Sequence, residues 1–384
     1  MIGVTDRKEY KVFMIRVLHV VGKMHRGGIE SLIMDIYKNI NRSMIQFDFL
    51  CTEKGDFDDE IISMGGKIYY ITPRSKSIKR NYSEIYTICK NNKDIKIIHN
   101  HLSSLSYLEP IRAAKNAGLK ARIVHSHNNN MDYSFFRKVL IFFNKTRMKR
   151  LCTDYFACSN EAGIWMFGKK IWDRNGILIK NGIKSEKFIF NNLCRNIYRK
   201  EMNLQEKFVV GFIGRFENQK NPLFLIDVFS EIKKIKKNAI LFFIGEGSLH
   251  EEMNKKLKDY GLLKDVYYTG VIDNVNEYIN VIDVLVQPSL FEGLGIIFIE
   301  AQTNSLKCFG SDKVPDDAKI SSYFKKISLD KTSKEWAKII ISESLNYKRD
   351  FNMINIVNQE EYDIKITAKK IEKIYLERGN YVRK

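Results

Sequence analysis

Two glutamates near a glycine-rich turn are the residues of this chain best suited to chemistry. Glu292 lies in the turn of the sequence PSLFEGLGIIFIEAQ (residues 288–302), and Glu300 follows eight positions later. The apolar run 281–287 predicts a strand before the turn, and the apolar residues after it predict a helix that starts near Gly295. Both carboxylates can therefore border one pocket at the carboxyl end of a sheet, where they would accept hydrogen bonds from sugar or ribose hydroxyls. Solvated glutamates in a loop and on a helix face are the alternative.

The same turn and a second loop predict an anion site. At the helix N-terminus the dipole favours a phosphate, and free N–H groups are expected from Gly293, Leu294 and Gly295. The second loop, GRFENQK, follows the apolar strand 208–213 and contains Arg215 and Lys220. Arginine can bind two phosphate oxygens at once and lysine supplies a point charge, so the pair suits a diphosphate. Two surface cations are the alternative for this pair alone.

Two features of the N-terminal half could reach the same pocket. The strand 15–21 leads into the loop GKMHRGGIE, in which Gly27 and Gly28 precede a helix, but the Lys and Ser/Thr of a P-loop are missing. Four histidines form the patterns HNH at 99–101 and HSH at 125–127, each at the end of a predicted strand. Both rings of such a pair lie on one face of a strand, so zinc has to be considered, although no cysteine or carboxylate spacing completes a site. Structural roles for at least two of the four rings are the alternative.

Strands and helices alternate along the chain and must position these residues. In the first half, helical stretches separate strands predicted at 15–21, 46–50, 67–71, 95–99 and 121–125. The alternation resumes at residue 208. This pattern predicts an α/β fold with doubly wound parallel sheets, in which ligands bind at the carboxyl ends of the strands. A chain of 384 residues is long enough for two such domains.

Composition narrows the class of protein. The hydrophobic content of 44% and the formal net charge of +19 are typical of a basic, soluble, globular protein. The charge would suit nucleic acid, an anionic membrane surface or acidic substrates, or it is a background of abundant lysine. Six cysteines without a CxxC pair indicate reduced thiols in a cytosolic protein. The polar N-terminus is unlike a signal peptide, and no apolar run approaches the length of a transmembrane helix.

One segment combines cations with aromatic residues. Residues 134–150, SFFRKVLIFFNKTRMKR, predict a basic helix with an aromatic side. Such a helix can lie on an anionic membrane surface. A core-facing apolar stripe with a solvated basic face is the alternative.

Taken together, these motifs resemble family 4 glycosyltransferases of the GT-B fold, which are group 1 glycosyltransferases of the bacterial exopolysaccharide and capsule type. The stretch FEGLGIIFIE at 291–300 resembles the family signature of two glutamates separated by seven residues. The resemblance implies that Glu292 lies near the donor sugar hydroxyls and that Glu300 bonds the nucleotide ribose. The family commonly has glycine and proline where this chain has Ser305 and Lys307, which puts the local turn in doubt.

The resemblance also implies roles for residues outside the signature. Arg215 and Lys220 would bind the donor diphosphate and stabilise it as the leaving group. His127 is the first choice, and His125 the second, for the histidine beside the reacting sugar. The loop with Gly27 and Gly28 would lie in the cleft between donor and acceptor. The nucleobase is expected near the backbone of Val271 and Ile272.

The implied architecture is a pair of Rossmann-like domains that face a cleft. The N-terminal acceptor domain is expected at 1–183, of which 1–13 are interpreted as an extension or an upstream start. A linker is expected at 184–206 and the nucleotide-sugar donor domain at 207–361. A helix within 362–384 is expected to pack back on the N-terminal domain.

The sequence is therefore interpreted as that of a retaining glycosyltransferase. It would move a sugar from a nucleotide-diphospho-sugar, with UDP favoured, to a hydroxyl of a lipid-linked glycan in exopolysaccharide or capsule synthesis. No metal cofactor and no nucleic-acid partner are expected, because cations and helix ends would take the role of magnesium. The expected location is the cytoplasm, with peripheral attachment to the inner face of the plasma membrane through residues 134–150.

Two other classes of protein remain as alternatives. One is a non-catalytic, basic protein that binds glycans or nucleic acid. The other is an NAD-type oxidoreductase, but the first loop of neither domain has its GxGxxG motif.

Overall fold

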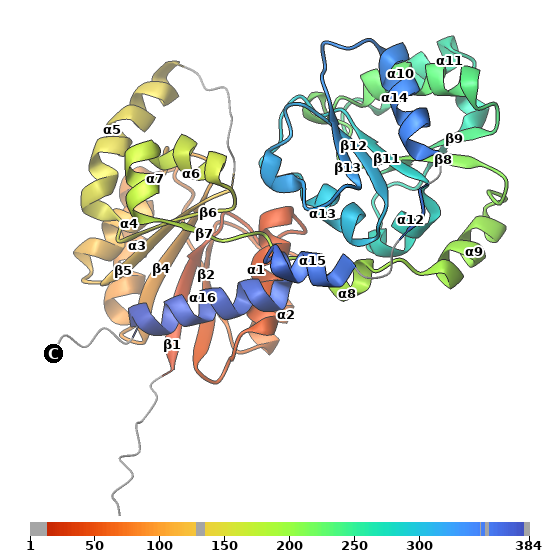
Figure 1. The fold of residues 1–384 in the computed structure, drawn as a ribbon. Helices are drawn as coiled ribbons and strands as arrows, with labels where there is room; N and C mark the ends of the chain where they lie inside the picture. The colour runs from red at the N-terminus through yellow and green to blue at the C-terminus, as the bar shows by residue number, and fades with distance from the viewer. Residues whose placement is uncertain (1–13, 128–134, 346, 350–352, 380–384) are drawn as a thin grey trace, which may run out of the picture.

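Two parallel sheets organise the chain (Figure 1). The computed structural model describes residues 14–127, 135–345, 347–349 and 353–379, without the side chains of 135–138. The first sheet has seven strands in the order β3-β2-β1-β4-β5-β6-β7, and the second has six in the order β10-β9-β8-β11-β12-β13. The predicted doubly wound α/β fold with two domains is confirmed.

The first sheet is covered on both faces, which explains why its central strands are rich in buried apolar residues. Its strands are β1 (Ile15–Val20), β2 (Ile45–Cys51), β3 (Lys67–Tyr70), β4 (Ile95–Leu102), β5 (Ala121–Ser126), β6 (Asp154–Ala157) and β7 (Gly176–Leu178). One face packs against α3 (Ile78–Asn91), α4 (Glu109–Asn116), α5 (Phe135–Leu151), α6 (Asn160–Phe167) and α7 (Lys169–Asn175). The other face packs against α1 (Gly28–Asn39), α2 (Asp58–Ser63) and α16 (Ile364–Gly379).

The second sheet repeats this arrangement. Its strands are β8 (Phe208–Ile213), β9 (Ala239–Ile244), β10 (Val266–Tyr268), β11 (Val284–Gln287), β12 (Lys307–Ser311) and β13 (Phe324–Ile327). One face packs against α10 (Pro222–Ile235), α11 (His250–Asp259) and α14 (Ser333–Ser344). The other face packs against α9 (Asn192–Glu201), α12 (Val275–Val281) and α13 (Ile296–Thr303).

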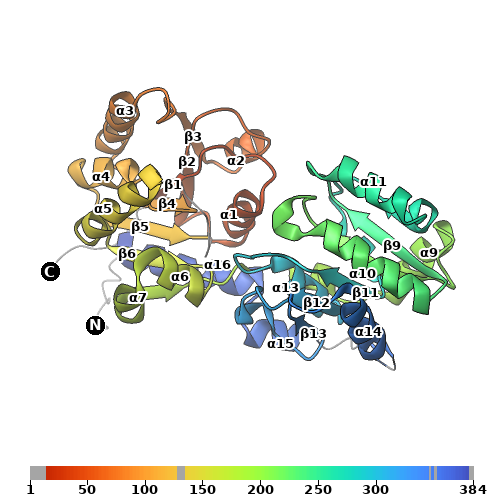
Figure 2. The same cartoon turned by 90° about the horizontal axis from the view of Figure 1, so that it is seen from above.

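The two crossings between the domains lie side by side. The Ile183 N–H donates to the carbonyl of Tyr362 at 2.7 Å, and the Ile364 N–H donates to the carbonyl of Ile183 at 2.8 Å. The backbones are so close that a Cβ at Gly182 would lie 2.7 Å from the Cα of Ile364. After this crossing, α16 runs along the first domain beside α1 (Figure 2).

Two segments differ from the predicted elements. The predicted linker 184–206 contains α8 (Ser185–Phe188) and α9, both packed against helices of the second domain. The predicted strand 281–287 begins only at Val284, because Val281 ends α12. A continuous apolar run carries no periodicity that would mark a change from helix to strand. Within the described residues, no helix is both long and apolar enough to span a bilayer.

Candidate functional site

Each sheet reverses its strand order at one point, and the predicted residues lie there. The reversal falls between β1 and β4 in the first sheet and between β8 and β11 in the second. In open parallel sheets, such switch points form the ligand crevice. Arg215 and Lys220 follow β8, and Glu292 follows β11.

Glu292 and Lys220 meet directly. The Lys220 Nζ lies 2.6 Å from Oε1 of Glu292, and the Ser289 hydroxyl donates to the same oxygen at 2.7 Å. Glu292 is only 4% exposed. A buried carboxylate needs such a counter-charge and such hydrogen bonds, because the interior solvates it poorly. The ion pair therefore holds a negative charge at the carboxyl end of β11.

Further contacts hold the two loops together. The Leu290 N–H donates to the carbonyl of Gln219 at 2.8 Å, and the Gln219 side chain donates to the carbonyl of Phe291 at 3.2 Å. Arg215 is exposed, and its guanidinium makes a long contact of 3.4 Å to Oε1 of Gln219. The Arg215 side chain is therefore exposed on a loop that hydrogen bonds hold in place, and it can turn toward an anion.

The helix N-terminus predicted at Gly295 is present. Gly295 is the N-cap of α13 with φ +78°, a conformation that favours glycine. Within the part of the chain that the structure describes, the N–H groups of residues 293–295 make no hydrogen bond. At the end of β11, the amide side chain of Gln287 is buried, and neither its nitrogen nor its oxygen has a partner among the described residues. No pattern in the sequence pointed to Gln287.

Glu300 lies in α13, five residues after the N-cap. Burial raises the pKa of its carboxyl to about 8. A carboxyl with this pKa is largely protonated at neutral pH, and a ligand that donates hydrogen bonds to it would favour the charged form.

Close backbone contacts also hold together the loops that follow β8 and β9. Gly245 has φ +131°, and a Cβ there would lie 2.2 Å from the carbonyl oxygen of Gly214. The loop after β9 therefore requires glycine in order to lie against the loop after β8. The turn after α13, which the sequence had put in doubt, is present, and Ser305 adopts φ +55° in it.

The four predicted histidines belong to a cluster of five. His19 on β1 pairs in register with His99 on β4, and His101 pairs in register with His125 on β5. Burial lowers the pKa of His19 to about 3 and that of His127 to about 4. The pKa values of the remaining three are well below the usual value for the same cause. All five imidazoles are therefore neutral at physiological pH.

The cluster contains two histidine triads with the spacing of metal ligands. One consists of His19, His99 and His101, and the other of His101, His125 and His127. Neither triad includes a carboxylate or a thiolate, so an ion there would be held by neutral imidazoles alone. Most of the ring nitrogens form hydrogen bonds with one another, and a nitrogen that bound an ion would have to give up its hydrogen bond.

The glycine-rich loop reaches the opposite domain. Gly27 is the N-cap of α1, and a Cβ there would lie 2.3 Å from Oε2 of Glu30. The neighbouring Arg26 lies 2.6 Å from both carboxylate oxygens of Asp273. Asp273 follows Val271 and Ile272, of which Val271 is 73% exposed. The ion pair thus links the loop that was predicted to lie between donor and acceptor to the predicted nucleobase loop.

The predicted site residues form two groups. In the first group, named the donor group for its predicted role, Lys220 and Glu292 contact each other directly. Arg215 and the N-terminus of α13 lie on the same loops. The histidines form their own cluster in the first domain, and no hydrogen bond joins it to the donor group among the described residues. Five further residues were not singled out. His19, Arg26 and Asp273 have partners that lie far away in sequence, whereas no pattern in the sequence marks Ser289 or Gln287.

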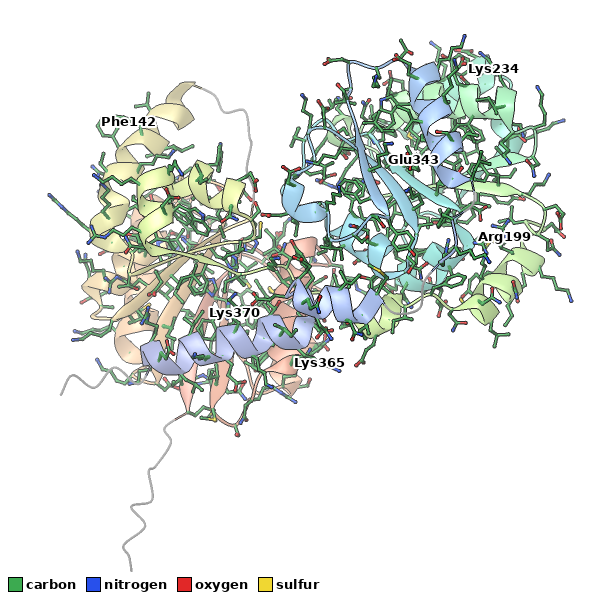
Figure 3. The ribbon with its side chains drawn as sticks, in the orientation of Figure 1. Phe142, Arg199, Lys234, Glu343, Lys365 and Lys370 are labelled. Carbon is green, nitrogen blue, oxygen red and sulfur yellow. The ribbon has the colours of Figure 1, made fainter. Side chains whose placement is uncertain are left out.

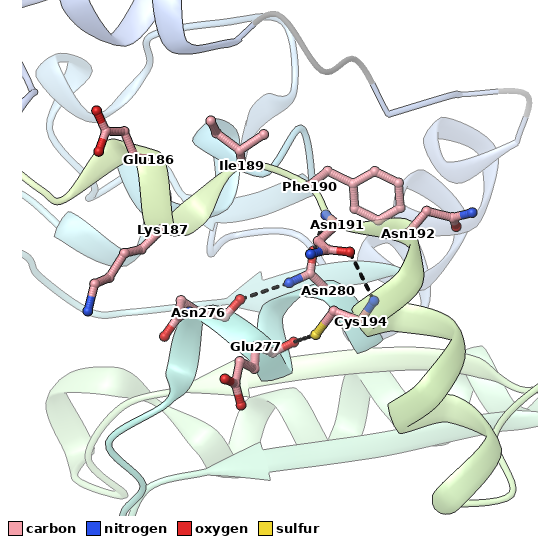
Figure 4. A pocket seen from close by; sticks show the side chains of 10 residues that line it. All are labelled: Glu186, Lys187, Ile189, Phe190, Asn191, Asn192, Cys194, Asn276, Glu277 and Asn280. Carbon is pink, nitrogen blue, oxygen red and sulfur yellow. Dashed lines mark hydrogen bonds between the residues drawn. The ribbon is translucent and has the colours of Figure 1, made fainter.

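A cavity of about 520 Å³ lies outside both groups (Figure 4). It is bounded by the segment from α8 to α9 and by α12. Its lining residues are Glu186, Lys187, Ile189, Phe190, Asn191, Asn192, Cys194, Asn276, Glu277 and Asn280. None of them is a predicted site residue.

The sequence of this chain is similar to those of known glycosyltransferases. The family model "Glycosyl transferases group 1" matches residues 195–355. The putative glycosyltransferase EpsF of Bacillus subtilis (strain 168) is 30% identical over 336 residues, which cover 85% of this chain and 86% of EpsF. The capsular polysaccharide biosynthesis glycosyltransferase CapH of Staphylococcus aureus is 28% identical over 379 residues, or 94% of this chain and 99% of CapH.

Among solved structures, the fold is similar to that of HepE from Anabaena in complex with UDP and glucose. The TM-score is 0.76 at 15% sequence identity, and the match covers 94% of this chain and 99% of HepE. At this identity the likeness concerns the fold, which is GT-B.

Proposed function

The chain belongs to the group 1 glycosyltransferases, and from this premise we propose that it transfers a sugar from a UDP-sugar to a hydroxyl of a lipid-linked glycan, in the family 4 manner, with retention of anomeric configuration. Capsule or exopolysaccharide assembly is the proposed setting, because CapH is named for capsular polysaccharide biosynthesis. UDP is the proposed nucleotide, because it occupies the similar fold of HepE.

One observation carries the proposal. At the switch point of the second sheet, an exposed arginine, a lysine and a helix N-terminus lie on the loops that hold a buried glutamate, and the glutamate pairs with Lys220. A diphosphate would meet Arg215, Lys220 and the N–H groups of residues 293–295, and these fixed dipoles would stabilise charge as it develops on the leaving group. A non-catalytic binding protein or a nicotinamide enzyme has no need of this combination.

The remaining residues would hold the two substrates. Glu292 would accept hydrogen bonds from donor sugar hydroxyls once Lys220 turns toward the diphosphate. Glu300 would accept the ribose hydroxyls, and the nucleobase would lie against the backbone of Val271 and Ile272. His127, with His125 second, would border the reacting sugar from the first domain, beside the loop of Gly27 and Gly28.

An exposed surface of the first domain supports the proposal that the acceptor is linked to a lipid. Phe142 is 66% exposed and points away from the sheet (Figure 3). It lies on α5 beside the exposed Phe143, and exposed cations follow at 145, 147, 149 and 150. An anionic membrane would meet both charges and aromatic rings there, which would bring the enzyme to a lipid-linked acceptor. Residue 134 and the side chains of 135–138 lie outside the described residues.

A nucleotide-binding assay tests the core of the proposal. Melting temperatures are measured with UDP-, GDP- and ADP-sugars, with and without EDTA, for the wild type and Arg215→Ala. A UDP-sugar should raise the melting temperature, because a ligand that binds the folded state stabilises it. The rise should be insensitive to EDTA and should be lost in Arg215→Ala. Equal stabilisation of wild type and variant would refute the diphosphate site, and a requirement for a divalent cation would refute the metal-free scheme.

A further inference from the structure

The five histidines and Tyr375 of α16 form two hydrogen-bonded chains. In the first chain, His19 Nδ1 lies 2.9 Å from His101 Nε2, and His101 Nδ1 lies 3.0 Å from His127 Nε2. In the second chain, the Tyr375 hydroxyl lies 2.5 Å from His99 Nδ1, and His99 Nε2 lies 3.2 Å from His125 Nδ1. We refer to these as the His127 chain and the His125 chain.

Within each chain, all the hydrogen bonds must point in the same direction. A neutral imidazole has one N–H donor and one nitrogen acceptor, and burial keeps these rings neutral. A ring that accepts at one nitrogen must therefore donate from the other. The tautomer of the last ring follows from the first donor of its chain.

The His125 chain has a fixed direction. Tyr375 is 1% exposed, and His99 is its hydrogen-bond partner among the described residues. If His99 donated, the hydroxyl hydrogen would be left without an acceptor, which is unfavourable in a buried position. The hydroxyl therefore donates to His99 Nδ1. His99 then carries its hydrogen on Nε2 and donates to His125 Nδ1, so His125 carries its hydrogen on Nε2.

Among the described residues, the His127 chain has no such anchor. It ends at His19 Nε2 and at His127 Nδ1, and both atoms are buried without a partner among the described residues. Either direction leaves one N–H and one lone pair unmatched, so neither is preferred. The His125 chain also ends at a buried nitrogen without a described partner, His125 Nε2, but its direction makes that nitrogen a donor.

We propose that Tyr375 and His99 are positioning residues that hold His125 as an Nε2–H donor, so that a ligand oxygen at the histidines meets one fixed donor at His125 and one adaptable ring at His127. A buried N–H without a partner is costly, and a hydroxyl or phosphate oxygen would satisfy it. The inference rests on the proposed function where it places substrate beside His125 and His127. The tautomer itself does not depend on that function.

Histidine side-chain NMR tests the tautomer directly. The chain has seven histidines, so selective ¹⁵N labelling gives a tractable spectrum, and single His→Gln variants assign it. Protonated and unprotonated ring nitrogens differ widely in chemical shift. In the wild type, His99 and His125 should both carry hydrogen on Nε2. Hydrogen on Nδ1 of His125 would overturn the proposal without any variant.

Two tyrosine variants then test the role of Tyr375. Tyr375→Phe keeps the packed ring and removes the donor, so the shifts of His99 and His125 should move toward a mixture of both tautomers. Tyr37→Phe is the matched control, because Tyr37 lies in the same core, also contacts Phe47, and donates to Gln46. It should leave the histidine shifts unchanged. Unchanged His125 shifts in Tyr375→Phe would refute the positioning role.

Turnover separates this inference from the proposed function. With a UDP-sugar that the wild type uses, Tyr375→Phe should lower kcat about tenfold and leave the donor KM within about twofold, because the donor site lies in the other domain. Tyr37→Phe should change neither constant. If the NMR result holds and kcat is unchanged in Tyr375→Phe, the placement of substrate at His125 is wrong. If no nucleotide sugar binds or turns over, the proposed function fails, and the NMR result still decides the tautomer.

Discussion

The pair of Lys220 and Glu292 places a lysine where two partners would compete for it. In the structure Lys220 neutralises a buried glutamate, whereas the proposed reaction asks it to neutralise a diphosphate. Binding of the donor would therefore release Glu292 to accept hydrogen bonds from sugar hydroxyls. Lys220 would then pair with the diphosphate and Glu292 with the sugar hydroxyls, so that Glu292 is not left without a partner.

Substitution of Lys220 should cost stability even without ligand. Lys220→Met removes the counter-charge of Glu292, and breaking a largely buried pair of this kind should lower the free energy of unfolding by roughly 2–4 kcal/mol. Denaturant unfolding measures this change. Lys256→Met is the control, because Lys256 pairs with Asp227 at 2.7 Å on a more exposed surface, and the cost there should stay below about 1 kcal/mol. Equal losses in both variants would contradict the buried pair.

Glu300 should make stability depend on pH in the opposite sense to a salt-bridged carboxylate. Its pKa is about 8 in the folded protein and about 4.3 in the unfolded chain, so only the unfolded chain ionises between these values. The wild type should lose unfolding free energy relative to Glu300→Gln as pH rises through this window, by at most about 1.4 kcal/mol per pH unit. Because part of the residue remains exposed, this slope is an upper limit. Parallel stability curves from pH 5 to 8 would rule out the raised pKa.

The sequence predicted site residues wherever the evidence for them was local. Glu292 and Glu300 share one stretch, and Arg215 and Lys220 share another, so motif spacing sufficed to find them. The ion pair between Lys220 and Glu292 joins positions 72 residues apart, and no local pattern encodes it. The roles of these residues stay predictions until the donor is identified.

Among the elements, the central strands were predicted, whereas the strands β7, β10, β12 and β13 were not. Both faces of each sheet are covered, so the strands are apolar runs that a sequence displays plainly. β4 was predicted to end at His99 but continues to Leu102, because pairing with β5 extends the strand through polar residues. The helices within 184–206 were missed, since tertiary packing stabilises short polar helices that have little propensity of their own.

The proposed contact with an anionic membrane can be tested on helix α5. Replacing Phe142 and Phe143 with serine should reduce binding to vesicles that contain anionic lipid at least tenfold, because the rings would no longer enter the interface. Vesicle co-sedimentation at physiological salt measures this binding. Leu193→Ser is the control, since Leu193 is 70% exposed on α9 of the other domain. Unchanged binding of the double variant would show that α5 does not face the membrane.

At the scale of the whole molecule, the Arg26–Asp273 pair spans the two domains. Both side chains are largely exposed, so the pair should contribute little to overall stability. Because the pair joins the loop before α1 to the loop before α12, it would favour closure of the two domains around a donor. The position of one domain relative to the other depends on such contacts between distant residues, and local periodicity does not encode them.

A charge-reversal series tests this contact. Arg26→Asp and Asp273→Arg should each raise the donor KM about threefold or more, and the double variant should restore it, because the pair is re-formed with reversed polarity. Melting temperatures should stay within about 2 °C of the wild type. If the double variant behaves as the sum of the single variants, the two residues act independently and the contact has no role in closure.

The packing of α16 has a consequence for the synthesis of the protein on the ribosome. Tyr375 and its neighbours complete the core of the first domain, yet they are translated about 200 residues after β7, its last strand. At about 5–20 residues per second, the emerging domain waits roughly 10–40 s with the part of its sheet that α16 covers still exposed. The two domains therefore reach their final cores almost together, although one of them is made long before the other.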